Sequence, residues 1–166
     1  MSEFINTVDN IGDEVLTNSI IDRSITEIQD NYATLIGRNA FSNCSALTTA
    51  DFPAVISIKD HAFYQCSSLT TMNFSAVTSI DDYTFYRCST LTALILHSET
   101  MATLNGSSAF SNTPIASGTG YIYVPSSLIN SYKTASNWST YAAQFRALED
   151  YTIDGTITGA LDESKI

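Results

Sequence analysis

The phrase AFSNCSAL at residues 40–47 is repeated as AFYQCSSL at 62–69 and as TFYRCSTL at 84–91. The three copies recur at one constant interval, and other apolar positions follow it too: I-x-x-x-A-F-x-x-C-x-x-L-x-x-h-x-h-x-x-V, where h is apolar. A single unit is too short to bury its own apolar side, so the units must stack on one another. The residues expected to form this stacked core are Phe41, Phe63 and Phe85; Cys44, Cys66 and Cys88; and Leu47, Leu69 and Leu91.

A period in the low twenties with fixed apolar offsets predicts an α/β leucine-rich-repeat solenoid, with one short strand in each repeat. Three regular repeats of this length are flanked by degenerate ones. Residues 25–36 align with the second half of a unit. Phe110 follows Phe85 at three positions more than the regular interval, which places a small insertion at about 98–107.

The segments outside the repeats have other patterns. Tyr121–Val124 has the composition of a last strand, stopped by Pro125. A helical C-terminal cap is expected after it, because Leu128, Tyr132, Trp138, Tyr141 and Phe145 could form one apolar face. The predicted division is an N-terminal cap or attachment segment at 1–24, with a short helix over 12–21; a solenoid at 25–124; a helical cap at 125–150; and a hairpin with a polar tail at 151–166.

The three cysteines share one register with the phenylalanines and leucines, which favours a buried structural role. A disulfide and a metal site are the alternatives. The cysteine count is odd and no C-x-x-C pair is present, so neither has a complete framework. The expectation is that the protein has no metal site and no cofactor.

The chain is acidic, with 17 Asp and Glu against 7 Lys and Arg, a formal net charge of -10. This balance argues against nucleic acid or anionic lipid as the main partner. The sequence has no apolar run of about 18 residues, and its first residues lack the basic and apolar regions of a signal peptide. We therefore expect no membrane partner and synthesis without a signal peptide.

Two sets of residues between the core positions are candidate contact surfaces. On the strands, Thr49, Thr71 and Ala93, and two residues further Asp51, Asn73 and Ile95, are expected to form a small polar sheet face. This face could bind an extended peptide or a glycan, or it could be a threonine ladder that only favours strands. In the turns, Tyr64 with Tyr86 and His61 with Tyr83 could form an aromatic interface, or could pack over the edge of the repeats.

Catalytic signals are weak. Only His61 and His97 could act as bases at neutral pH, and the motifs of hydrolases, metalloproteases and nucleotide-binding proteins are missing. Asp81 and Asp82 are adjacent, and adjacent side chains on a turn point apart, whereas an acid and a base must converge. The sequence therefore predicts a protein that is not an enzyme.

The phrase A-F-x-x-C-x-x-L, followed by two alternate apolar positions and V-x-x-I, resembles the BspA-like class of bacterial leucine-rich repeats over residues 25–124. The ending YIYVPSSLINSYKTASNWSTYAAQF is similar to the strand and helical cap of that class. The resemblance implies a contact protein, since members are mostly surface proteins implicated in adhesion, and related domains occur in bacteriophage structural proteins.

The short form without a leader looks more like a virion component, such as a head fibre or tail-associated protein made in the host cytoplasm. Its expected partners are other virion or surface proteins or a glycan, and a homo-oligomer, guessed as a trimer, is possible. The alternative is a monomeric adhesion or binding module on the bacterial cell surface or secreted.

Overall fold

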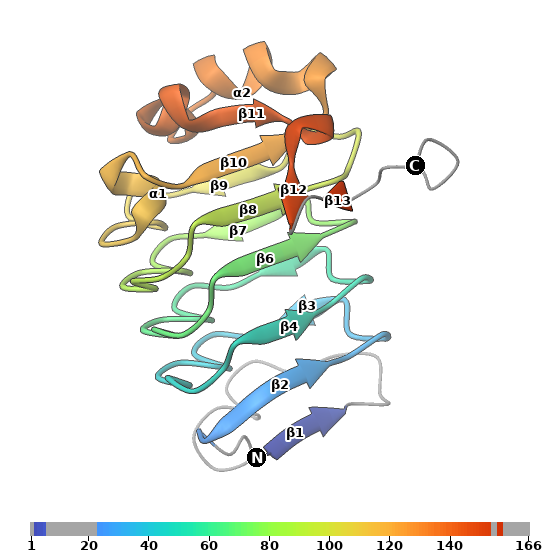
Figure 1. The fold of residues 1–166 in the computed structure, drawn as a ribbon, viewed down its shortest axis with the longest axis vertical. Helices are drawn as coiled ribbons and strands as arrows, with labels where there is room; N and C mark the ends of the chain where they lie inside the picture. The colour runs from blue at the N-terminus through green and yellow to red at the C-terminus, as the bar shows by residue number, and fades with distance from the viewer. Residues whose placement is uncertain (1, 6–22, 154–155, 158–166) are drawn as a thin grey trace.

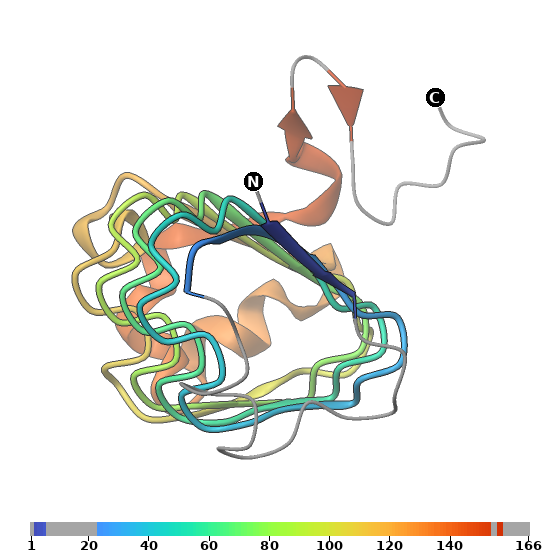
Figure 2. The same ribbon diagram turned by 90° about the horizontal axis from the view of Figure 1, so that it is seen from below.

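Stacked coils build the protein into a parallel β solenoid (Figure 1). The computed structural model describes residues 2–5, 23–153 and 156–157. The short helix or irregular cap expected over 12–21 and the polar tail expected at 159–166 lie outside these residues. Viewed along the stack, successive coils nearly superimpose (Figure 2). The prediction of a repeat solenoid is therefore confirmed.

Two sheets form the long sides of the solenoid. The seven-stranded one, called here the front sheet, is parallel throughout and has the order β1 (Ser2–Ile5), β2 (Ile25–Gln29), β4 (Thr49–Asp51), β6 (Thr71–Phe74), β8 (Ala93–Leu96), β10 (Tyr121–Val124) and β11 (Phe145–Ala147). The back sheet is also parallel and consists of β3 (Leu35–Ile36), β5 (Ser57–Ile58), β7 (Ser79–Asp81) and β9 (Thr103–Asn105).

Each regular coil thus contributes two strands, and the prediction of one strand per repeat is wrong. The back sheet forms at the isoleucine that recurs once in each repeat. Ile36 pairs there with Ile58, and Ile58 pairs with Ile80. All three isoleucines are fully buried. Any extended stretch that lies in register with its own copy one coil later can form a parallel ladder, even when it is only two residues long.

The insertion in the last repeat is divided between two places. β6 and β8 keep the regular interval, since Phe74 pairs with Leu96, whereas Ser79 of β7 pairs with Thr103 and not with Met101. Two extra residues therefore lie between β8 and β9. The third follows β9 at Gly106, where an added Cβ would lie 2.1 Å from Cγ of Asp82. The chain needs a glycine there because the Asp82 side chain fills the space.

A ladder of phenylalanine rings runs through the core beside the turns. The rings of Phe41, Phe63, Phe85 and Phe110 stack with centroid separations of 5.3, 5.5 and 5.5 Å and interplanar angles of at most 12°. The amides of the first three donate to carbonyl groups of the next coil at 2.7–2.9 Å. All nine residues of the predicted core are buried with 0% exposure.

The helix α1 (Pro114–Ser117) lies in the turn before β10, at the side of the solenoid. The segment after β10 lies over the last coil, as Figures 1 and 2 show from two directions, and contains η1 (Ser126–Leu128), α2 (Ile129–Thr134) and η2 (Trp138–Gln144). The Tyr132, Trp138, Tyr141 and Phe145 side chains are buried. Their polar atoms bond to the coil below: Trp138 Nε1 donates to the carbonyl of Ala102, and the amide of Ala102 donates to the Tyr132 hydroxyl.

After β11 the chain turns onto the outer side of the front sheet. The single turn η3 (Leu148–Asp150) is followed by β12 (Thr152–Ile153) and β13 (Thr156–Ile157), which pair antiparallel. In Figure 2 this segment leaves the coil on the side of the front sheet, and its hairpin projects away from the coil. It is the one described segment that leaves the solenoid path.

We predict that Phe63→Ala lowers the free energy of unfolding by about 3–5 kcal/mol, because it leaves a cavity between two stacked rings. Urea denaturation followed by circular dichroism measures this loss. Tyr32→Ala is the control, since 54% of Tyr32 is exposed. Equal losses in the two variants would contradict the account of the core.

Candidate binding surfaces

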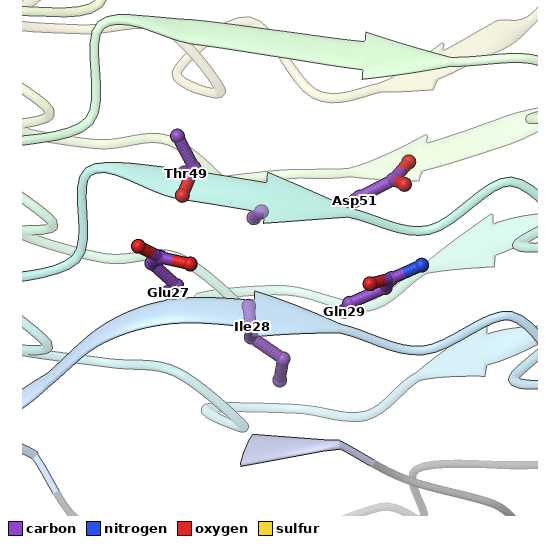
Figure 3. A pocket seen from close by; sticks show the side chains of 6 residues that line it. Glu27, Ile28, Gln29, Thr49 and Asp51 are labelled. Atoms are coloured by element: carbon purple, nitrogen blue, oxygen red, sulfur yellow. The ribbon is translucent and has the colours of Figure 1, made fainter. Parts of the chain in front are cut away.

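The open part of the front sheet is a polar face on β2, β4 and β6. Thr49, Asp51 and Asn73 are exposed there, and Thr71 is half-buried. Between β2 and β4 lies a shallow depression of about 210 Å³ (Figure 3). It is lined by Glu27, Ile28, Gln29, Thr49, Ala50 and Asp51. Sequence reasoning did not include Glu27 and Gln29 among the candidates, although β2 aligns with the other strands.

The charge of this face is negative. Glu27 and Asp51 are its two charged residues, and β2, β4 and β6 contain neither lysine nor arginine. Strands in a sheet are about 4.8 Å apart, so these three strands provide a surface about 10 Å wide. That width fits a single extended chain with its side chains.

The same face is closed at β8 and β10, and the expectation that Ala93 and Ile95 belong to an open polar face is wrong. Both are buried, with 6% and 1% exposure, in a small cluster with Leu148 and Tyr151. The Tyr151 ring lies 4.8 Å from that of Tyr123, and its hydroxyl is hydrogen bonded to Thr71. The chain covers its own sheet at this point because two apolar residues replace the polar ones found in earlier coils.

Four aromatic side chains gather at the turns that lead from the back sheet to the front sheet. His61 stacks on Tyr83 at 5.0 Å and 13°, and Tyr64 stacks on Tyr86 at 5.4 Å and 8°. The two stacks touch side by side, with centroids 5.2 and 5.4 Å apart. We call these four residues the aromatic ladder. Tyr83 is exposed and the other three are half-buried.

The backbone of these turns is left-handed at two places per coil. Asn39, His61 and Tyr83 have φ values of 57–60°, and a second set two residues after each phenylalanine includes Asn43, Gln65 and Arg87 at 58–63°. Asparagine and histidine are both enriched in this region, whereas a tyrosine is unusual there. Of the three residues, Tyr83 thus occupies a position that a short amide fits better.

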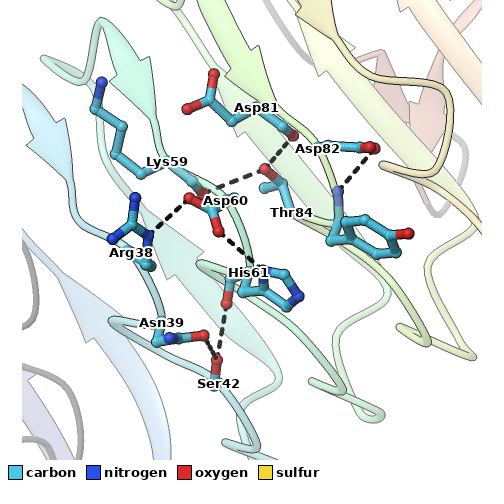
Figure 4. A network of polar contacts seen from close by, with 10 residues as sticks. Arg38, Asn39, Ser42, Lys59, Asp60, His61, Asp81, Asp82 and Thr84 are labelled. Atoms are coloured by element: carbon cyan, nitrogen blue, oxygen red, sulfur yellow. Dashed lines mark hydrogen bonds and ion pairs between the residues drawn. The ribbon is translucent and has the colours of Figure 1, made fainter.

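A polar network joins neighbouring turns beside the aromatic ladder (Figure 4). Arg38 Nε donates to Asp60 Oδ1 at 2.9 Å, and His61 Nδ1 lies 3.0 Å from Asp60 Oδ2. Partial desolvation raises the pKa of Asp60, but the hydrogen bonds from Arg38 and His61 outweigh it and leave the pKa below its ordinary value. Asp60 is therefore ionised at neutral pH, and it orients the imidazole by accepting from Nδ1.

The side chains that could do acid–base chemistry do not converge. Asp81 Oδ1 accepts from Asn105 Nδ2, whereas Asp82 Oδ1 accepts from the amides of Tyr83 and Ser108. His97 is bonded to Asn73 Oδ1 on another coil, and burial lowers its pKa. Within the described ranges no group of three His, Cys, Asp or Glu side chains is placed to hold a metal ion.

The three cysteines are fully buried, and none of them forms a disulfide within the described residues. Two of the thiols form hydrogen bonds between coils. Cys66 Sγ donates to the carbonyl of Phe41 at 3.1 Å, and Cys88 Sγ donates to the carbonyl of Phe63 at 3.0 Å. Arg23 Nη1 lies at the other end of the row, 3.6 Å from Cys44 Sγ. Burial raises the pKa of the Cys66 thiol well above its ordinary value, and the neighbouring Cys88 adds to the shift.

These features define a class: a parallel β solenoid of leucine-rich type with two open surfaces, a polar sheet face and an aromatic turn. The sequence matches the family model for the BspA type leucine rich repeat region over residues 9–140, in six copies. The match covers more than half of the chain, and the protein belongs to this family. No curated protein matches the sequence significantly. In the part of the chain that the structure describes, no helix is long and apolar enough to cross a membrane.

The buried thiol of Cys66 makes stability depend on pH. The unfolded thiol titrates near pH 8.5 and the folded one well above, so stability is complete below about pH 8.5 and falls at higher pH, where only the unfolded state loses the proton. At pH 9.5 we therefore expect a lower free energy of unfolding than at pH 7. Urea denaturation at pH 7 and 9.5 should show a smaller loss for Cys66→Ala than for the natural protein. Identical losses would contradict this account.

Proposed function

We propose that this protein is a non-enzymatic binding module that holds an extended, positively charged polypeptide against the open part of its front sheet. The observation that carries the proposal is that a segment of this chain packs on the outer side of the same sheet. Leu148 and Tyr151 lie across the same sheet at β8 and β10 and bury two residues there. The outer side of this sheet is therefore a surface on which a further segment of polypeptide can pack.

Charge gives the expected chemistry of the partner. Glu27 and Asp51 are exposed on either side of the depression, and the whole chain has a formal net charge of -10. A partner with lysine or arginine side chains on one face would be steered to this surface and paired there. Gln29, Thr49 and Asn73 would supply hydrogen bonds beside the charged groups.

The test uses a fluorescent peptide of alternating lysine and threonine and measures Kd by anisotropy at two salt concentrations. We expect binding that weakens with salt, and a roughly tenfold loss in the double variant Glu27→Gln/Asp51→Asn, because two exposed ion pairs are worth about 1 kcal/mol or less each. Glu99→Gln/Glu149→Gln removes the same charge elsewhere and is the control. Equal losses in both double variants would show attraction to net charge alone and would refute the site.

The C-terminal segment has a second proposed role, as the cap of the solenoid. A coil at the end of a stack exposes the surface that would otherwise face the next coil, and a cap prevents end-to-end association. Support comes from the buried rings of Tyr132 and Trp138 over the last coil.

The biological setting proposed for the module is a bacteriophage virion, as a head fibre or tail-associated protein. This rests on the family resemblance alone, as does a trimer. A bacterial surface or secreted module is the alternative. Light scattering on a sizing column tests the first setting: a stable trimer is its expected result, and a monomer of 18.0 kDa would favour the alternative.

A further inference from the structure

The aromatic ladder is two rings long in each stack, and it ends where small residues take over. In the preceding coil the equivalent positions are Asn39 and Ser42, one repeat before His61 and Tyr64. Since Tyr86 covers one face of the Tyr64 ring, the other face points toward Ser42. The ladder therefore presents ring faces toward a coil that supplies no ring of its own at these positions.

The Ser42 side chain is engaged in a polar contact between the two turns. Its hydroxyl oxygen lies 2.8 Å from the carbonyl oxygen of His61 and 3.0 Å from Asn39 Oδ1, two acceptors that share its one proton, and only 7% of the residue is exposed (Figure 4). The opposite end of the ladder differs, because the Arg87 guanidinium lies 5.6 Å from the centroid of the Tyr86 ring. The open ring surface is therefore at His61 and Tyr64.

The His61 ring is accessible, since 36% of its side chain is exposed. The hydrogen bond from Nδ1 to Asp60 also fixes the imidazole and leaves Nε2 as its other polar atom.

We propose that the open end of the aromatic ladder, at His61 and Tyr64, is a second binding site and that its ligand is a neutral glycan. A sugar ring offers C–H groups of slight positive charge to the negative face of an aromatic ring, and hydroxyl groups to neighbouring amides and carboxylates. Asn39 and Asn43 lie in the preceding coil and could form hydrogen bonds with the sugar hydroxyl groups. Tyrosine combines this contact area with a polar tip and little loss of rotamer freedom.

The charges around the ladder favour a neutral ligand. Three cationic residues, Arg38, Lys59 and Arg87, are balanced by three acidic ones, Asp60, Asp81 and Asp82. Arg38 is already paired with Asp60. This turn therefore differs from the front sheet, whose open part is acidic, and the two surfaces are expected to bind different ligands.

Native affinity electrophoresis with soluble neutral polysaccharides as probes (mixed-linkage β-glucan, xylan, galactomannan and dextran) tests the proposal. At least one probe should retard the natural protein, and Tyr64→Ala should weaken its apparent affinity at least tenfold. Tyr64→Phe keeps the ring face and should bind within about threefold of the natural protein. Tyr32→Ala, which removes an exposed tyrosine outside the ladder, should bind normally.

His61→Asn separates recognition from folding, because asparagine suits the left-handed backbone. This variant should melt at or near the natural temperature and still bind the polysaccharide several times more weakly. The Glu27→Gln/Asp51→Asn protein should bind the polysaccharide normally. The proposal of a glycan site and the proposal of a peptide-binding sheet face are therefore tested independently. The proposal is overturned if no probe retards the protein, or if Tyr64→Ala and His61→Asn bind as tightly as the natural chain.

Discussion

The hydrogen bond between the amide of each core phenylalanine and a carbonyl of the next coil fixes the rest of the structure. These bonds measure 2.7–2.9 Å at Phe41, Phe63 and Phe85, and they set the coils in the register in which the rings stack. The same register aligns the thiol of Cys66 with the carbonyl of Phe41 and places each pair of back-sheet strands side by side. Equivalent residues of neighbouring coils therefore lie next to each other. For this reason the polar sheet face and the aromatic ladder both run along the stack.

The two surfaces arise from the same repetition and are closed in different ways. On the front sheet, polar residues continue until β8, where Ala93 and Ile95 are covered by the chain's own Leu148 and Tyr151. At the turns, the aromatic ladder starts at His61 and stops after Tyr86, between small residues. The solenoid thus carries two chemically different surfaces on neighbouring coils, and each ends where the residue type at a repeated position changes.

The sequence predicts the core well because Phe, Cys and Leu recur at one constant interval, and one interval determines stacking. The back sheet was missed because its strands are two or three residues long and show only one repeated apolar position, Ile36 with Ile58 and Ile80. The burial of Ala93 and Ile95 under the C-terminal segment could have been predicted, because these two positions are polar in the earlier repeats and apolar here. The left-handed backbone of these turns had only a weak signal, the asparagines Asn39 and Asn43, because later coils place other residue types at the same positions.

Amide hydrogen exchange resolved to single residues tests the central claim, that inter-coil bonds at the turns hold the solenoid in register. The amides of Phe41, Phe63 and Phe85 should be among the slowest to exchange and should respond together to low concentrations of urea. The amide of Tyr151, which donates within its own turn to Leu148, should exchange earlier. Fast exchange at the phenylalanines, with slow exchange confined to the C-terminal segment, would contradict the account.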